Sequence, residues 1–284
     1  VLFGVILALI GILSVTHDTP VKSVIAEGDK GGPPTIDDPL FTRTIELFTG
    51  THIEPGNAVQ IMLNGLGTYP QLWKDISSSQ QTVTVQMYYS QPGAVADTLS
   101  KYLIDRAQHK VRVLLLLDAF GSQPLKKDWI RGLKKAGVEV VWLRPLRWYT
   151  LQKAAQRSHV RVVVVDGKIG YTGGFGLADY WLGDGHHEDQ WRESNVRFEG
   201  PTVAALQAAF AAAWAEATGE LLTGDLFFPK TSFASVGDVQ AGLMHSIPST
   251  GSTPAERFLA LSIAGARKTL YITNSYFVPG ENFM

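Results

Sequence analysis

Two short segments of this chain carry apolar side chains almost without interruption, and they constrain the fold more than any other feature. Val111–Leu117 reads VRVLLLL, and Arg161–Val165 reads RVVVV. A strand with one solvated face alternates apolar and polar residues, whereas a strand covered on both faces does not. Both segments are therefore expected to be strands that are buried on both faces of a sheet.

Strand and helix patterns alternate around these two segments. Further strands are expected at Val59–Leu63, Val83–Tyr89, Val138–Leu143 and Lys168–Thr172, and helices at Tyr69–Ser79, Val95–His109, Pro124–Ala136 and Pro201–Ala217. Asp166-Gly167 is a hairpin-turn signal. Strands that alternate with helices of about 10–15 residues predict an α/β sandwich with a mixed, mostly parallel sheet.

Two parts of the chain repeat the same order of expected elements. Val59–Gly93 runs strand, helix, strand and ends TVQMYYSQPG, and Val239–Gly280 runs the same way and ends LYITNSYFVPG. A repeat of this length predicts two similar lobes, with Leu270–Phe277 as the counterpart of Val83–Tyr89. We expect a first lobe at 41–230 and the truncated start of a second lobe at 231–284.

The chain opens with VLFGVILALIGILSV, an uncharged run at 1–15. As a helix that rises about 1.5 Å per residue, it would cover about 22 Å of a hydrocarbon core of roughly 30 Å. Three interpretations are open: a truncated transmembrane anchor, the apolar part of a signal peptide, and a buried core helix. The anchor is favoured, because no convincing small-x-small cleavage site follows Val15. Segment 16–40 is rich in Gly and Pro and predicts a flexible linker.

The formal net charge of −1 conceals an uneven distribution. Asp97–Gly170 holds fifteen Lys and Arg against six Asp and Glu, so it carries +9 and the rest of the chain carries −10. A basic middle indicates an anionic partner, such as a phospholipid, a nucleic acid or a small phosphate, or else a set of solvated helix faces. The chain has no cysteine, which excludes disulfides, thiolate metal sites and cysteine nucleophiles.

One cluster of residues has the types that phosphate chemistry needs. Segment 158–166 reads SHVRVVVVD, and Gly173-Gly174 follow it. Positions i and i+2 of a strand share a face, so His159 and Arg161 point the same way. An imidazole can serve as nucleophile or proton relay, and a guanidinium can hold phosphate oxygens. Asp166 has the opposite parity, so the strand alone does not bring it to His159.

The segment HVRVVVVDGKIGYTGGFGLADYW resembles the signature of the phospholipase D superfamily, His-x-Lys-x-x-x-x-Asp followed by Gly-Gly or Gly-Ser. From about Pro39 to its end, the chain is also similar to the bacterial cardiolipin synthase-like branch, in stretches such as VRVLLLLDAFGS and WRESNVRFEGPTV. The resemblance implies two lobes that each supply one motif, and a reaction without metal or cofactor. One histidine attacks the phosphodiester to give a phosphohistidine, and the other protonates the leaving alcohol.

Carried over residue by residue, the resemblance makes His159 one of the two catalytic histidines, either the nucleophile or the acid/base. Arg161 stands where the phosphate-binding lysine belongs, and Asp166 is the orienting acid. Gly173 and Gly174 would let the backbone pass close to the site. Arginine in place of lysine favours an adapted site over a dead one. The partner histidine is expected at about position 347, so this chain alone is expected to lack half of the active site.

Further candidates come from strand ends and from one loop. Three residues at the ends of expected strands are candidate substrate-binding residues: Tyr88, Asp118 and Asn274. Segment 184–189 reads DGHHED, but adjacent residues rarely ligate one ion together, so a solvated loop is expected in place of a metal site. Trp181 and Trp191 could contact lipid or pack in the core, and packing is favoured.

The expected function is a membrane-associated phosphodiester transferase for anionic phospholipids, either a cardiolipin synthase-like phosphatidyltransferase or a phospholipase D. The expected location is the cell membrane, which in a bacterium is the inner membrane. The expected partners are the membrane and its anionic phospholipids. No nucleic acid and no obligate protein partner are expected. The alternatives are a nuclease of the same superfamily and a catalytically degenerate, membrane-tethered binding protein. A net charge of −1 disfavours nucleic acid. The acceptor, water or a lipid alcohol, stays open.

Overall fold

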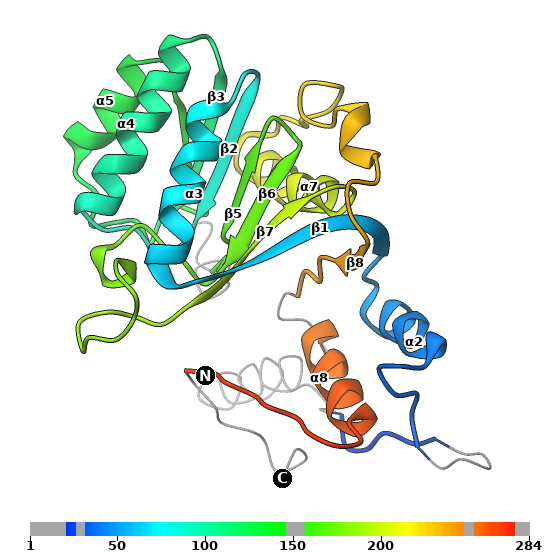
Figure 1. Cartoon of the computed structure of the whole chain (residues 1–284). Helices are drawn as coiled ribbons and strands as arrows, with labels where there is room; N and C mark the ends of the chain where they lie inside the picture. Colours follow the sequence, from blue (N-terminus) through cyan, green and yellow to red (C-terminus); the bar gives the residue numbers. More distant parts are fainter. Residues whose placement is uncertain (1–20, 27–31, 146–156, 247–252, 276–284) are drawn as a thin grey trace, which may run out of the picture. The chain divides into compact units, whose positions relative to one another are not determined.

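The computed structural model describes residues 21–26, 32–145, 157–246 and 253–275 (Figure 1). The chain divides into two compact units. The larger is Glu54–Ala241, and the smaller combines Val1–Ile53 with Gly242–Met284. The expected transmembrane anchor at 1–15 lies outside the described residues. Within the described ranges, no helix combines the length and the apolar character that a membrane span needs.

The larger unit is built on one sheet of eight strands in the order β4-β3-β2-β5-β6-β7-β1-β8 (Figure 1). In chain order the strands are β1 (Ile53–Leu63), β2 (Thr82–Met87), β3 (Arg112–Asp118), β4 (Glu139–Leu143), β5 (Val162–Val165), β6 (Ile169–Gly173), β7 (Ser194–Glu199) and β8 (Val239–Gly242). Strands β2, β3 and β4 pair in parallel. The β2–β5, β5–β6, β6–β7 and β7–β1 pairs are antiparallel.

The sheet is therefore mixed, as predicted, but the expectation that it is mostly parallel is wrong. The tight turn at Asp166-Gly167 sends β6 back beside β5, and a parallel pair would have required a crossover connection. Both turn residues have positive φ, at 52° and 61°, which is the conformation of a two-residue hairpin turn.

Helices cover both faces of this sheet. They are α3 (Asn64–Ser78), α4 (Ala94–Gln108), α5 (Lys127–Lys135) and α7 (Thr202–Thr218). Leu115 and Leu117 of β3 belong to the core cluster that includes side chains of α3, α4 and α5. Their neighbours Leu114 and Leu116 are equally buried and point to the opposite face, on which α7 packs. The predicted burial of both faces of β3 is confirmed.

The expected helices and strands of the larger unit are confirmed, with shifted ends. Strand β1 begins at Ile53 and α3 begins at Asn64, each several residues earlier than expected. Strand β7 was not predicted, because its sequence SNVRFE is largely polar. In the structure, most of its side chains are only partly buried. Arg197 of β7 is neutralised by Asp75 of α3, whose Oδ2 lies 2.7 Å from the Arg197 Nε.

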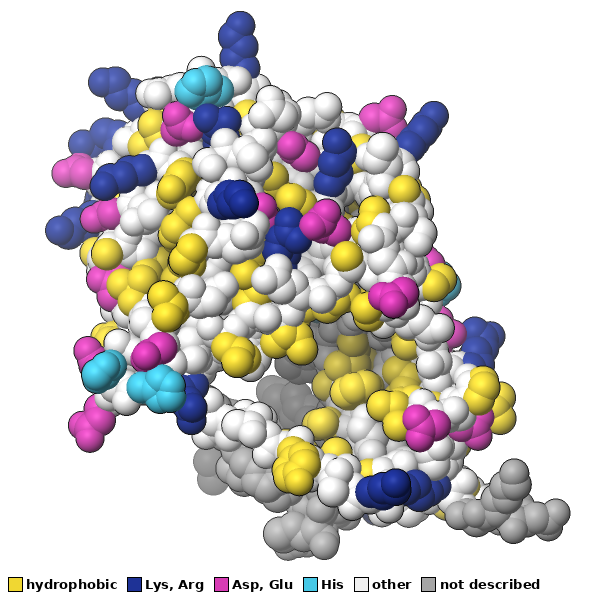
Figure 2. All heavy atoms as spheres, viewed as in Figure 1, with side chains coloured by type: hydrophobic (Ala, Val, Ile, Leu, Met, Phe, Trp, Pro, Cys, Tyr) yellow, Lys and Arg dark blue, Asp and Glu magenta, His cyan; other side chains and the backbone are white. Residues whose placement is uncertain are grey.

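Some of the basic residues of the middle segment lie on the outer helices α4 and α5. Figure 2 shows Lys and Arg side chains along the side of the larger unit where α4 and α5 lie. Lys126, Lys127, Lys134 and Lys135 at the two ends of α5 are all exposed. This distribution agrees with solvated helix faces.

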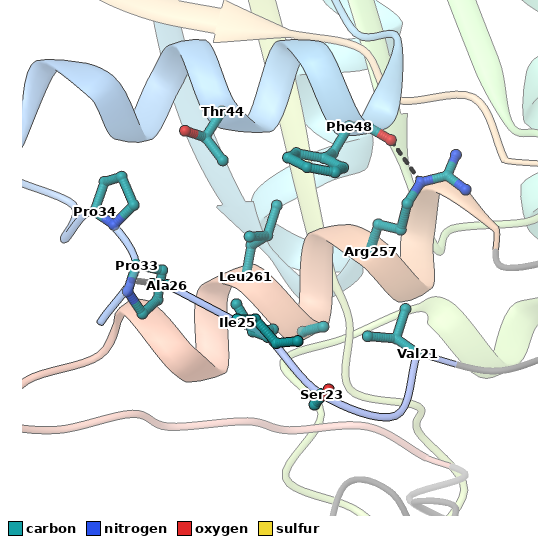
Figure 3. A pocket seen from close by; sticks show the side chains of 12 residues that line it. Val21, Ser23, Ile25, Ala26, Pro33, Pro34, Thr44, Phe48, Arg257 and Leu261 are labelled. Atoms are coloured by element: carbon teal, nitrogen blue, oxygen red, sulfur yellow. Dashed lines mark hydrogen bonds between the residues drawn. The ribbon is translucent and has the colours of Figure 1, made fainter. Parts of the chain in front are cut away.

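The smaller unit contains α2 (Pro39–Thr49) packed on α8 (Pro254–Gly265). Together with segment 21–26, these helices enclose a cavity of about 370 Å³ that is lined mainly by apolar side chains (Figure 3). The Nε of Arg257 donates a hydrogen bond to the carbonyl oxygen of Phe48 at its rim, over 2.6 Å. The cavity thus lies beside the C-terminal turn of α2.

The expected strand at Leu270–Phe277 is not formed over residues 270–275, and the rest of it lies outside the described residues. A strand needs a partner for its backbone groups, and Leu270, Tyr271 and Ile272 are exposed instead. The expected equivalence with Val83–Tyr89 is therefore wrong for residues 270–275. The lobe limits at 41–230 and 231–284 stay predictions.

Candidate active site

Most of the predicted site residues meet at one edge of the sheet. Tyr88 follows β2, Asp118 ends β3, and His159 and Arg161 precede β5. Because β2 and β5 are antiparallel, with Gln86 opposite Val162, the end of β2 lies beside the start of β5. Strand pairing thus gathers side chains that are 71 residues apart in the sequence.

The imidazole of His159 is exposed and stacked. The ring of Tyr88 lies on it, with centroids 3.8 Å apart and planes 21° from parallel. Partial burial and the nearby Arg161 cation lower the pKa of His159, and the Asp118 carboxylate opposes them. A lowered pKa favours the neutral imidazole near pH 7, which is the form that can attack phosphorus or accept a proton.

The guanidinium of Arg161 is half-buried at the same edge. Its Nε is buried and has no hydrogen-bond partner among the described residues. The guanidinium carbon lies 5.9 Å from the centroid of the Trp181 ring. Burial lowers the pKa of Arg161, and attraction to Glu193 opposes that effect. A half-buried cation with an unused donor is suited to binding an anion.

Glu193 joins the site, although the sequence patterns did not single it out. Its backbone N–H donates to Asn64 Oδ1 over 2.8 Å, and its carbonyl accepts from the Asn64 N–H over 2.7 Å. A Cβ on Gly174 would come within 2.0 Å of Glu193 Oε2. Glycine at position 174 therefore makes room for this carboxylate, and only the tertiary structure reveals the pair.

Gly173 has a similar steric role beside β7. Its φ is 151°, and a Cβ on it would lie 2.2 Å from Asn195 Oδ1. Asn195 is buried and donates from Nδ2 to the Thr68 hydroxyl over 2.9 Å. The predicted close approach of backbone at Gly173 and Gly174 is therefore an approach to Asn195 and Glu193. A contact with substrate stays a prediction.

Asp166 is not beside His159, and its expected role as the orienting acid is not met. The two residues flank opposite ends of β5. The Asp166 carboxylate instead accepts backbone N–H groups from Gln80, Gln81 and Thr82, at distances of 2.8–3.2 Å. It ties the β5–β6 turn to the start of β2.

The other candidate substrate-binding residues differ in their surroundings. Asp118 is buried; its Oδ1 accepts from the N–H groups of Phe120 and Gly121, at 2.9 and 3.0 Å. Its Oδ2 is buried without a hydrogen-bond partner among the described residues. Asn274 is exposed and belongs to the smaller unit, so its predicted role stays a prediction.

The loop with the sequence DGHHED is exposed at most of its positions. In the described part of the chain, no group of three or more His, Cys, Asp and Glu side chains is placed to hold a metal ion. Trp181 packs in the core, as favoured, but Trp191 does not, since it is about half exposed. Trp191 lies in the loop that precedes β7, where its N–H donates to the Tyr180 carbonyl over 2.6 Å.

An accessible imidazole beside a guanidinium whose Nε has no hydrogen-bond partner among the described residues, at the edge of a mixed α/β sheet, is an arrangement suited to phosphodiester chemistry. The family model described as "Cardiolipin synthase, PLD-like domain" matches residues 72–214, which is half of the chain. The chain therefore belongs to this phospholipase D-like family, as its sequence motif predicted. The larger unit is a phospholipase D-like α/β fold with a mixed sheet.

Individual relatives agree with this family. Cardiolipin synthase 1 of Bacillus cereus is 28% identical over 250 residues, which are 85% of this chain and 49% of the relative. Cardiolipin synthase A of Pseudomonas putida is 28% identical over 258 residues, 87% of this chain and 53% of the relative. The chain spans about half the length of these curated relatives. The solved structure of Nuc from Salmonella typhimurium, a phospholipase D family member, is 14% identical, with a TM-score of 0.43, and covers 59% of this chain and 99% of that chain.

Proposed function

We propose that this chain contributes a phosphodiester-transfer site that acts on anionic phospholipids. The observation that carries the proposal is the pairing of an exposed, stacked imidazole at His159 with the half-buried Arg161, whose Nε has no hydrogen-bond partner in the described part of the chain. The names of the relatives, cardiolipin synthases, support a phosphatidyl group as the one transferred.

In the proposed reaction, an imidazole nitrogen attacks the phosphorus of the diester. A P–N bond forms as the P–O bond to the first alcohol breaks, and that alcohol takes a proton from an acid. A second alcohol or water then attacks the phosphohistidine, gives up its proton to a base, and the P–N bond breaks. Arg161 stabilises the charge on the phosphate oxygens throughout. His159 is the nucleophile or the acid/base, and the second histidine is expected in a partner motif.

The proposed location is the membrane. Phospholipid substrates reside there, and the uncharged run at 1–15 is suited to anchoring. The active unit Glu54–Ala241 would then act on lipid head groups while tethered through segment 16–40. Neither the side of the membrane nor the acceptor alcohol enters the proposal.

Substitution at His159 and Arg161 tests the proposal in the protein expressed at the full length that its gene encodes. His159→Ala should lower head-group release or transfer from phosphatidylglycerol by at least about 10²–10⁴-fold, because a nucleophile or proton donor is lost. Arg161→Ala should lower it by roughly 10²–10³-fold through loss of charge stabilisation. Arg161→Lys keeps the cation and should retain more activity than Arg161→Ala.

The matched control is Lys168→Ala, which removes an exposed cation at the far end of β5 and should leave the rate unchanged. Thermal melting of each variant checks that it is folded. Equal rates for wild type and His159→Ala would refute the mechanism. Cleavage of single-stranded DNA by wild type, without any phosphatidylglycerol turnover, would favour the nuclease alternative.

A further inference from the structure

An aromatic surface begins at Arg161 and extends to solvent. Arg161 faces the ring of Trp181, which meets Trp191 edge-on with centroids 4.9 Å apart. Trp191 in turn stacks on Tyr180, with centroids 5.3 Å apart. The exposed fraction is 2% at Trp181, 48% at Trp191 and 42% at Tyr180. These three residues are called the aromatic shelf below, and they connect the candidate phosphate site to the surface.

Two exposed leucines lie on backbone segments next to the aromatic shelf. Leu182 directly follows the short helix η2 (Asp179–Trp181), and Leu66 lies in the first turn of α3. The Leu66 N–H donates to the Gly183 carbonyl over 2.8 Å, so the two segments are joined through their backbones. Exposed large apolar side chains gathered on joined segments are typical of a binding site.

An unused donor in the shelf also indicates a ligand. The Nε1 of Trp181 is buried and has no hydrogen-bond partner among the described residues, as is true of the Arg161 Nε. Buried polar groups in folded proteins are nearly always paired, so two unpaired donors on adjoining side chains are unusual. A ligand that carries oxygen acceptors would satisfy such donors.

The charge around the shelf discriminates between ligands. Residues 183–193 carry four carboxylates, at Asp184, Glu188, Asp189 and Glu193, against the single cation Arg192. A nucleic acid strand stacked on the shelf would bring one phosphate per nucleotide past these carboxylates and be repelled. A phospholipid can place its phosphate at Arg161 and present only an uncharged glycerol and acyl part to the shelf.

We propose that the aromatic shelf binds the glycerol-ester and upper acyl-chain region of the phospholipid whose phosphate lies at Arg161. Trp and Tyr are suited to this region, because their rings are apolar and their N–H and O–H groups can meet ester oxygens. The proposal rests on the proposed function for the position of the phosphate. It adds a site that selects lipid diesters over small, soluble ones.

Two substrates separate this site from the chemistry. The double variant Trp191→Ala/Tyr180→Ala should lower kcat/KM for long-chain phosphatidylglycerol in detergent micelles by about tenfold or more, chiefly through KM. Hydrolysis of bis(p-nitrophenyl) phosphate, which has no acyl chain, should be unchanged. The double variant Trp191→Phe/Tyr180→Phe keeps both aromatic rings. Its kcat/KM for the micellar lipid should stay close to that of wild type. Equal losses on both substrates would show a merely structural role and overturn the proposal.

The matched control is Phe233→Ala. Phe233 is also aromatic and 59% exposed, but it lies on η3 (Lys230–Phe233), whose Ser232 hydroxyl donates to the Gly167 carbonyl at the opposite end of β5. The kcat/KM of the Phe233→Ala variant for both substrates should equal that of wild type. A loss of micellar activity as large as that of the double variant would overturn the proposal.

A binding measurement distinguishes failure of this proposal from failure of the proposed function. Phosphatidylglycerol brominated near the head of its acyl chains should quench tryptophan fluorescence in wild type, and less so in Trp191→Phe. Such a difference in quenching would support lipid binding at the aromatic shelf even if the protein turned over no lipid. In that case only the proposed function would fail. Equal quenching in the two proteins would overturn it. Quenching that single-stranded DNA abolishes would also overturn it, in favour of a base-stacking surface.

Discussion

At the scale of single residues, the imidazole of His159 lies among groups that shift its pKa in opposite directions. Partial burial and Arg161, two residues further along the chain, lower the pKa of His159, whereas Asp118 at the end of β3 raises it. Tyr88, from the end of β2, contributes the stacked ring. The segment that follows β2 is held there through the Ser90 N–H, which donates to the Gly121 carbonyl over 3.0 Å.

These opposing effects predict the sign of two pH shifts. Asp118→Asn removes a neighbouring negative charge, so the pKa of His159 should fall and the limb of the kcat/KM profile that reports it should move to lower pH. Arg161→Gln removes a positive charge and should move the same limb to higher pH. The sign holds whether His159 acts as nucleophile or as acid.

The control for the pH profiles is Glu139→Gln, an isosteric change at the start of β4, at the opposite end of the sheet from Asp118. Its profile should coincide with that of wild type. Shifts of Asp118→Asn and Arg161→Gln in the same direction would contradict the electrostatic explanation.

At the scale of elements, Asp166 shows how one residue joins a turn to a neighbouring strand. Its φ of 52° is in the left-handed region, which Asn and Asp tolerate better than most residues. Its carboxylate accepts three backbone N–H groups from Gln80–Thr82, where β2 begins. The expected role as an acid for His159 came from family resemblance, and the strand parity of the residue already spoke against it.

Removal of this carboxylate should weaken the fold without affecting the chemistry directly. Asp166→Ala should lower the free energy of unfolding by about 3 kcal/mol, through lost charge-assisted hydrogen bonds and strain at positive φ. Asp166→Gly also removes the carboxylate, but glycine adopts a positive φ without strain. Its free energy of unfolding should therefore fall by about 1 kcal/mol less than that of Asp166→Ala. Urea unfolding measures both, and a fully folded, fully stable but inactive Asp166→Ala would instead indicate a catalytic role.

At the scale of the whole molecule, the sheet, its core and the candidate site all belong to the unit Glu54–Ala241. Deletion of residues 1–15 should therefore release the protein from the membrane fraction and leave its melting temperature unchanged. Hydrolysis of bis(p-nitrophenyl) phosphate should also persist. Cell fractionation and thermal melting measure the outcome, and a shortened protein that melts at a lower temperature would indicate that the run packs in the core.

The control for the deletion is a chain in which two apolar residues of the run at 1–15 are replaced by arginine. If the run is an anchor, this charged version should also leave the membrane, because charged side chains are disfavoured in the hydrocarbon core. Retention of both variants in the membrane fraction would contradict the anchor.

The sequence by itself determined the α/β class, most of the elements of the larger unit and the pair His159–Arg161. The class and the elements depend on local patterns, namely uninterrupted apolar strands and helical spacing. The pair depends on its sequence motif, and its expected placement on a strand is wrong, because both residues precede β5. The antiparallel half of the sheet, strand β7 and the positions of Glu193, Tyr88 and Asp118 were decided only by the tertiary structure. Their contacts join segments far apart in the chain, and the energies of pairing, ion-pair formation and close packing that select them arise only once those segments meet.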